Sequence, residues 1–185
     1  RRSLRKENIA DLESRINVKL PSDYKRFLLL HNGGHPKQNC YSCLDIRMEG
    51  SDIDSFLAFY EGNISSLLTD INMYKNRIPK GFIPIARDSC GNLICLGVEG
   101  EKYNMVYFWE HEEESDECEN PTFDNMYLIA NNFIDFINKL FEFNVKEIKS
   151  SEYLYISTHD KYSISFSREA KKHGNLVLDF FAKAP

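Results

Sequence analysis

The chain has 185 residues, of which 42% are hydrophobic and 13% aromatic, and its formal net charge is −5. This apolar content supports a buried core and excludes an intrinsically disordered chain, while no apolar run approaches the roughly 18–20 residues that span a bilayer. The acidic balance disfavours nucleic acid as a partner, because phosphate neutralisation needs a basic face.

Two helices are predicted near the N-terminus. Apolar residues at roughly helical spacing indicate an amphipathic helix over 6–17. Pro21 and Ser22 then favour the start of a second helix over 22–31, since proline is tolerated at a helix entry and serine can cap one. Asn32-Gly33-Gly34 ends this helix, because Asn and Gly adopt positive φ at low cost.

Strands and helices fill the middle of the chain. Alternation predicts a well-buried strand over 53–59, and an apolar stripe predicts a third helix over 64–77. Three strands with Gly-containing turns then predict an antiparallel meander, in which Pro84 marks an edge or a bulge because it cannot donate to a ladder. The remaining expected elements are strands at 82–87, 93–98, 104–110 and 126–129, and a last helix at 132–143 with Asn132 and Asp135 as a capping pair.

Residues 145–185 are interpreted as an extension of a first domain that covers residues 1–144, and we expect the two to pack together. Tyr162, Ile164 and Phe166 alternate with serines in the extension, which indicates a half-buried strand. Most of the negative charge lies before the extension. We therefore expect the partner of this protein to be basic rather than acidic.

Two segments of the chain carry a family resemblance. Residues 20–34 read LP-x-x-Y-x-x-F-L and end in Asn-Gly-Gly, and a second segment runs from Ile83-Pro84-Ile85-Ala86 through Gly91-Asn92 to Val106-Tyr107-Phe108-Trp109-Glu110-His111. Both patterns, in this order and followed by a Phe-rich helix, resemble the SUKH superfamily. Its members include bacterial toxin-immunity proteins and fungal regulators of cell-wall synthesis.

The resemblance implies an α+β fold, with N-terminal helices and a C-terminal helix packed on a largely antiparallel sheet. It also implies a non-enzymatic, cytoplasmic protein-binding module, most of all an immunity protein that neutralises a cognate bacterial toxin by direct binding. A signalling or scaffold regulator of the cell-wall-synthesis type is the main alternative. A thiol-dependent or zinc-dependent enzyme is a minor one.

The five cysteines are the basis of the enzyme alternative. Cys40-x-x-Cys43 together with Cys90 and Cys95 supplies four thiols for a zinc site, and Cys118 with His111 supplies a thiol nucleophile with a base. An odd cysteine count in a core-forming chain argues against a disulfide framework, and Cys95 stands in an apolar run typical of a small core residue. We therefore expect no catalytic residue, no cofactor and no metal.

Seven carboxylates fall within ten residues directly after Trp109. They form either a solvated loop or a negative surface that attracts a basic partner such as a nuclease-like toxin. The second alternative is physically reasonable because clustered charge raises association rates. Trp109 is either part of the core or an anchor of the interface. The candidate partner-binding residues are Trp109, Glu110, Glu112, Glu113, Glu114, Asp116, Glu117 and Glu119.

Overall fold

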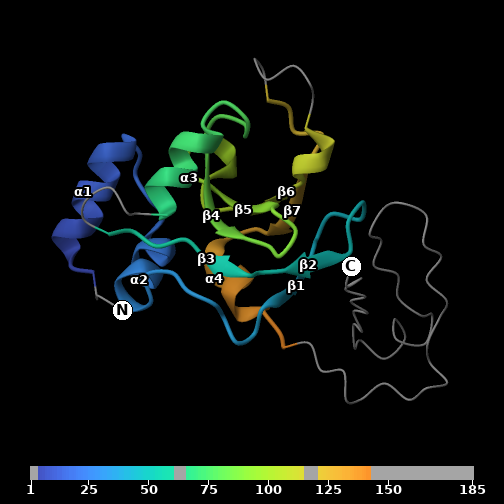
Figure 1. Ribbon diagram of the computed structural model, residues 1–185, viewed down its shortest axis with the longest axis horizontal. Coiled ribbons are helices and arrows are strands. Elements are labelled where there is room, and N and C mark those ends of the chain that lie inside the picture. The colour runs from blue at the N-terminus through green and yellow to red at the C-terminus, as the bar shows by residue number, and fades with distance from the viewer. Residues whose placement is uncertain (1–3, 61–65, 115–120, 143–185) are drawn as a thin grey trace, which may run out of the picture. The chain divides into compact units, whose positions relative to one another are not determined.

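The computed structural model describes residues 4–60, 66–114 and 121–142, which Figure 1 shows as a coloured ribbon. Nearly all of them belong to one compact unit, Arg1–Phe141. The predicted extension at 145–185 lies outside the described residues and stays a prediction. No helix in the described part of the chain has the length and the apolar content needed to cross a bilayer.

Helices and antiparallel strands make up the described residues, which confirms the predicted α+β class. The α-helices are α1 (Lys6–Ile16), α2 (Ser22–Leu30), α3 (Ser66–Tyr74) and α4 (Phe133–Asn138). The strands are β1 (Cys40–Ser42), β2 (Gly50–Asp52), β3 (Ser55–Phe56), β4 (Phe82–Arg87), β5 (Leu93–Gly97), β6 (Val106–Trp109) and β7 (Met126–Ala130). Two 3₁₀ turns, η1 (Gly100–Lys102) and η2 (His111–Glu113), lie before and after β6.

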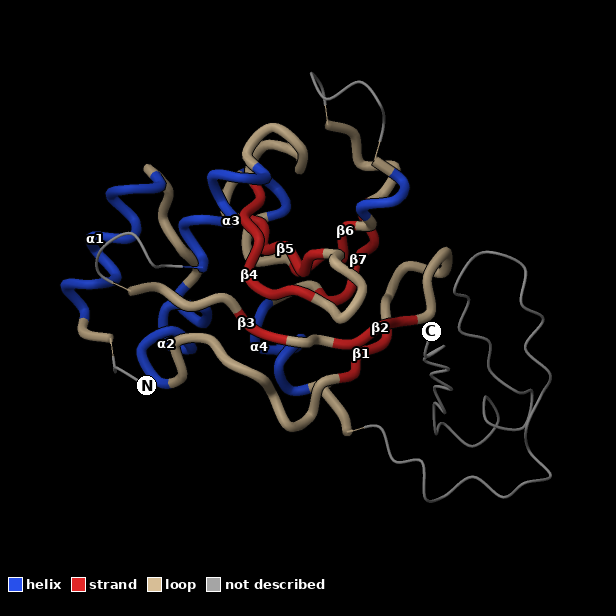
Figure 2. The backbone as a smooth tube through the Cα atoms, viewed as in Figure 1, coloured by secondary structure: helices blue, strands red, loops and turns tan. Residues whose placement is uncertain are grey.

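The main sheet has the strand order β3-β4-β5-β6-β7, and each neighbouring pair is antiparallel. Figure 2 shows these strands side by side, and they confirm the predicted meander. The register of β4 against β5 shifts between Pro84 and Ala86, which confirms the bulge expected at the proline. Strands β1 and β2 form a separate two-stranded antiparallel sheet.

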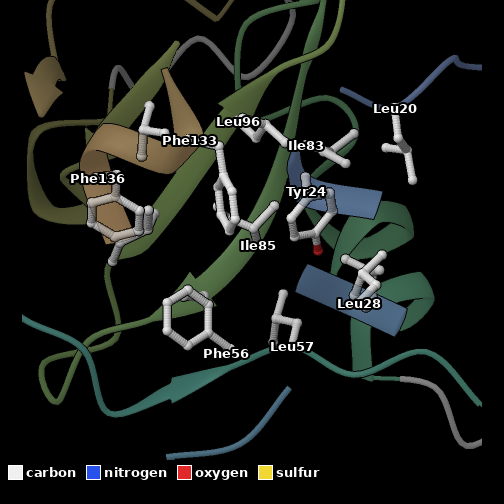
Figure 3. Packing of buried hydrophobic residues seen from close by; sticks show 14 of the residues in the cluster. Leu20, Tyr24, Leu28, Phe56, Leu57, Ile83, Ile85, Leu96, Phe133 and Phe136 are labelled. Atoms are coloured by element: carbon white, nitrogen blue, oxygen red, sulfur yellow. The ribbon is translucent and has the colours of Figure 1, made fainter. Parts of the chain in front are cut away.

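The main apolar cluster lies between one face of the large sheet and the helices. Ile94 of β5 and Phe108 of β6 belong to it, together with Leu12 of α1. Tyr24 of α2 and Phe133 of α4 lie next to each other in Figure 3, and their rings meet edge to face with centroids 5.1 Å apart. Because apolar burial contributes about 25 cal/mol per Å², the burial of this cluster stabilises the fold.

A second, smaller apolar cluster covers the opposite face of the sheet. Side chains alternate along a strand, so Cys95 of β5 and Trp109 of β6 point to this second face, where the Trp109 ring meets Tyr74 of α3 with centroids 5.6 Å apart. Phe82 joins them from β4, and Ile78, four residues after the end of α3, packs against them. The sheet is therefore buried on both faces, which explains the nearly continuous apolar character of β5 and β6.

Local turn chemistry follows the sequence predictions. The residues Asn32-Gly33-Gly34 end α2 with φ values of 45°, 81° and 107°. Asn132 Oδ1 caps α4 by accepting the Asp135 N–H at 2.9 Å. These contacts confirm the predicted helix end and the predicted capping pair.

Several predicted boundaries differ from the structure. The strand predicted at 53–59 is reduced to Ser55 and Phe56. Beyond it, Ala58 donates its N–H to Ser66 Oγ at 2.8 Å and Phe59 donates its N–H to Asn32 Oδ1 at 2.9 Å instead of to a strand. The last helix ends at Asn138 rather than at 143. Strands β1 and β2 were not predicted, since three residues are too few to show an alternating pattern.

Both outer strands of the main sheet have a backbone partner beyond them. Gly34 and Phe56 exchange hydrogen bonds of 3.0 and 2.9 Å at the β3 edge. At the β7 edge, Leu44 and Asp45 donate to the carbonyl of Leu128 at 2.8 and 3.1 Å. The segment that covers β7 is the connection between β1 and β2, residues 43–49, which we call the hairpin loop.

Candidate functional site

The described part of the acidic run, residues 110–114, leaves the end of β6 as a fixed turn, which we call the acidic turn. Glu110 donates its N–H to the carbonyl of Asn125 at 3.0 Å, and the Asn125 amide donates back to the Glu110 carbonyl at 2.9 Å. His111 donates its N–H to Asn92 Oδ1 at 3.0 Å. These bonds attach the acidic turn to the start of β7 and to the β4–β5 turn.

Asn92 is in turn held by Asp88, which organises the β4–β5 turn. Asp88 Oδ1 accepts the N–H groups of Cys90 and Asn92 at 2.9 and 2.7 Å, and Asp88 Oδ2 accepts the Asn92 amide at 2.8 Å. Short Asx side chains accept backbone N–H groups in this way in tight turns. Because the Asn92 Nδ2 group is used by Asp88, its oxygen is left to receive His111, and the acidic turn acquires a defined position.

Glu114 is tied to the body of the protein by an ion pair. The Arg77 Nε atom donates to both carboxylate oxygens of Glu114 at 3.0 Å, and Nη2 adds a third bond of 2.6 Å. The guanidinium carbon lies 4.9 Å from the ring centre of Tyr74 and 5.4 Å from that of Trp109. Arg77 therefore neutralises Glu114 while covering the second apolar cluster.

Glu113 is held by Tyr127 of β7, whose hydroxyl donates to its carboxylate. Partial burial, followed by the negative charge of Glu113, raises the pKa of Tyr127 to about 12, so the hydroxyl stays protonated at neutral pH. Arg47 of the hairpin loop lies over the same ring, with the guanidinium carbon 4.7 Å from its centre. Tyr127 therefore connects the acidic turn to the hairpin loop.

The remaining predicted site residues have different surroundings. Glu112 is exposed, whereas Glu110 is half-buried, and its desolvation raises the pKa of its carboxyl group above the ordinary value. Trp109 is fully buried in the second apolar cluster, which is the core role that the sequence also allowed. The residues Asp116, Glu117 and Glu119 lie outside the described part of the chain.

Sequence reasoning did not find the hairpin loop or its role beside the acidic turn. Arg47 Nη1 donates to the carbonyl of Asp124 at 3.3 Å, and Nη2 donates to that of Met126 at 3.0 Å. The only signal in the sequence is the alternation of Leu44, Ile46 and Met48 with three charged residues in this segment.

Residues 3–139 match the SMI1 / KNR4 family (SUKH-1). The chain belongs to this family. The match covers both segments that carried the resemblance, the hairpin loop and the acidic turn. The chain is also similar to the SPbeta prophage-derived uncharacterized protein YokK of Bacillus subtilis (strain 168), with 31% identity over 83% of this chain and 84% of that protein.

The cysteines of this SUKH-1 protein in the described residues have different surroundings, since Cys40 and Cys95 are buried, Cys43 is half-buried and Cys90 is exposed. Burial raises the pKa of Cys43 to about 12 and the pKa of Cys95 further still, so both remain thiols at neutral pH. No group of three or more His, Cys, Asp or Glu side chains within 4–60, 66–114 and 121–142 is arranged to hold a metal. Cys118, the predicted partner of His111, lies outside these ranges.

Proposed function

We propose that this SUKH-1 protein is a non-enzymatic, cytoplasmic immunity protein that neutralises a cognate bacterial toxin by direct binding. Family membership supports a role of this class. The prophage origin of the similar Bacillus protein fits it as well, since a mobile element must carry protection together with any toxin that it encodes. The expected partner is a basic toxin domain, for example one that holds a nucleic acid substrate.

The observation that carries the proposal is the fixed position of the acidic turn. Hydrogen bonds attach Glu110 and Glu113 to the sheet and an ion pair holds Glu114 to Arg77, while Glu112 is exposed to solvent. A surface that is already ordered loses little conformational entropy when a partner binds. Its negative potential attracts a basic partner and raises the association rate.

The test is the association rate of the purified protein with the toxin domain encoded beside its gene, measured against ionic strength. Glu112→Lys reverses an exposed charge of the acidic turn, and we expect association several-fold slower than wild type at low salt. The difference should shrink near physiological salt, where the screening length is about 8 Å. Equal rates at low salt would contradict a steering role for the acidic turn.

Glu7→Lys is the matched control. Glu7 is an exposed carboxylate in the first turn of α1, which lies well away from η2 in Figure 1. The same reversal of charge there should change the association rate much less than Glu112→Lys. Co-expression adds a functional readout, because wild type should restore growth to cells that produce the toxin. Failure to bind the toxin or to restore growth would refute the immunity function itself.

A further inference from the structure

We propose that Ile46, at the tip of the hairpin loop, is an apolar knob that inserts into a pocket on the basic toxin partner; the proposal rests on the immunity function given above. The Ile46 side chain is 98% exposed, more than any other large hydrophobic residue in the described part of the chain, and Leu44 beside it is 47% exposed. Covering an apolar side chain of this size removes it from water, which favours binding to a partner that buries it.

The exposure of Ile46 does not result from a loose loop. On one side of it, Leu44 and Asp45 donate to the carbonyl of Leu128. On the other side, Arg47 pairs with Asp45 at 2.7 Å, reaches two carbonyls in the segment that enters β7, and lies over Tyr127. The hydrogen bonds from Arg47 also lower the pKa of Asp45 below its ordinary value, which keeps the carboxylate charged. Ile46 is therefore held outward by its two neighbours.

The other apolar residues of the hairpin loop are used internally. Cys43 and Met48 pack against the main apolar cluster, and the Cys43 N–H donates to the Glu49 carbonyl at 2.9 Å to close the base of the loop. The loop thus divides its apolar side chains between an inner side that stabilises the fold and a tip residue, Ile46, that is almost fully exposed. A fixed, protruding apolar residue is typical of the centre of an interface, where a few buried side chains provide most of the affinity.

The charges around the loop indicate which kind of partner fits. The hairpin loop, the acidic turn and the residues attached to them contain seven carboxylates but only two guanidinium groups, at Asp45, Glu49, Glu110, Glu112, Glu113, Glu114 and Asp124 against Arg47 and Arg77. Tyr127 joins the two parts, since it contacts both Arg47 and Glu113. The complementary surface is an apolar pocket with Lys and Arg around its rim, which commits the proposal to a basic protein.

The experiment measures equilibrium affinity for the toxin domain encoded beside the gene, with wild type and two variants. Ile46→Ser should weaken binding by about tenfold or more, as expected for an interface hot spot. The matched control is Leu30→Ser on α2, where the side chain is 67% exposed, and we expect its affinity to stay within about twofold of wild type. Thermal unfolding should be nearly unchanged in both variants, because exposed substitutions have small effects on stability.

Each outcome decides one point. If wild type binds the toxin and Ile46→Ser binds it equally well, the proposed insertion of Ile46 is wrong while the immunity function stands. If wild type does not bind, both proposals fall together. Sedimentation of the protein alone tests whether Ile46 instead contacts a second copy of this chain. A dimer that forms in wild type and is lost in Ile46→Ser would assign the tip to self-association and overturn the proposal.

Discussion

Single side chains set the chemistry of the acidic turn, and Arg77 shows how. Its guanidinium binds Glu114 through three hydrogen bonds while its flat face covers Tyr74 and Trp109. The Glu114 side chain is 17% exposed and that of Arg77 is 37% exposed. The ion pair is therefore partly shielded from water. Glu114 serves mainly to hold the acidic turn in place and contributes less to its negative surface.

This arrangement leads to a prediction for stability. In a double-mutant cycle with Arg77→Gln and Glu114→Gln, we expect a coupling free energy of about 0.5–1 kcal/mol, as measured for ion pairs that remain partly solvated. Urea unfolding of the four proteins provides the measurement. A coupling indistinguishable from zero would show that the two side chains are independent in solution. Glu112→Gln, which removes an exposed carboxylate, should leave the free energy of unfolding almost unchanged and serves as the control.

At the scale of elements, one carboxylate connects the two N-terminal helices. Glu13 of α1 accepts the Leu20 N–H at 2.9 Å and pairs with Lys19 and Lys25 at 3.1 and 3.2 Å. Burial acts to raise the pKa of Glu13, but the hydrogen bonds from Leu20 and the two lysines outweigh it and lower the pKa below the ordinary value. Glu13 therefore favours the folded state in its charged form.

The sign of this shift predicts a pH dependence. A carboxyl group whose pKa is lower in the folded protein stabilises it above the unfolded pKa, about 4.3 for Glu, and this stability is lost as the pH falls through the folded pKa. We expect Glu13→Gln to lower the free energy of unfolding at pH 7, and its difference from wild type to shrink as the pH falls below about 4. Chemical unfolding of both proteins across this range gives the result. A difference independent of pH would contradict the role of the charge.

The elements also show what sequence patterns can and cannot predict. The meander was predictable because long alternating or apolar runs are separated by Gly turns, as in 82–110. Strands β1 and β2 were not, since their pairing depends on Gly50 meeting Ser42 across a loop rather than on a local period. The negative charge of the acidic turn was predictable, because carboxylates are concentrated in that part of the sequence. The ion pair that attaches the acidic turn to Arg77 was not predictable, because Arg77 lies 37 residues from Glu114 and no local pattern joins the two.

For the molecule as a whole, the main sheet carries apolar clusters on both faces, and this should set where the structure opens. Strand β5 is buried at every position and has a partner on each side. Strand β3 has only two residues in the ladder. Local opening is easiest where few apolar contacts and few protected hydrogen bonds must break.

Native-state hydrogen exchange tests this directly. We expect the slowest amide exchange in β5 and β6, with protection close to the global free energy of unfolding, and exchange at least about tenfold faster at Ser55 of β3. Residue-resolved exchange by NMR supplies the rates. Equal protection in β3 and β5 would show that the sheet opens only as one unit.

The way in which the hairpin loop covers β7 has a consequence for how this protein tolerates change. The contacts that shield the strand are backbone N–H groups of Leu44 and Asp45, which every residue except proline can supply. The identity of residue 46 is therefore free to vary between relatives without exposing the strand. Shortening the loop is different, because it withdraws those donors and leaves an open edge that invites aggregation. Substitutions at this tip should therefore leave the fold intact, whereas deletions should destabilise it.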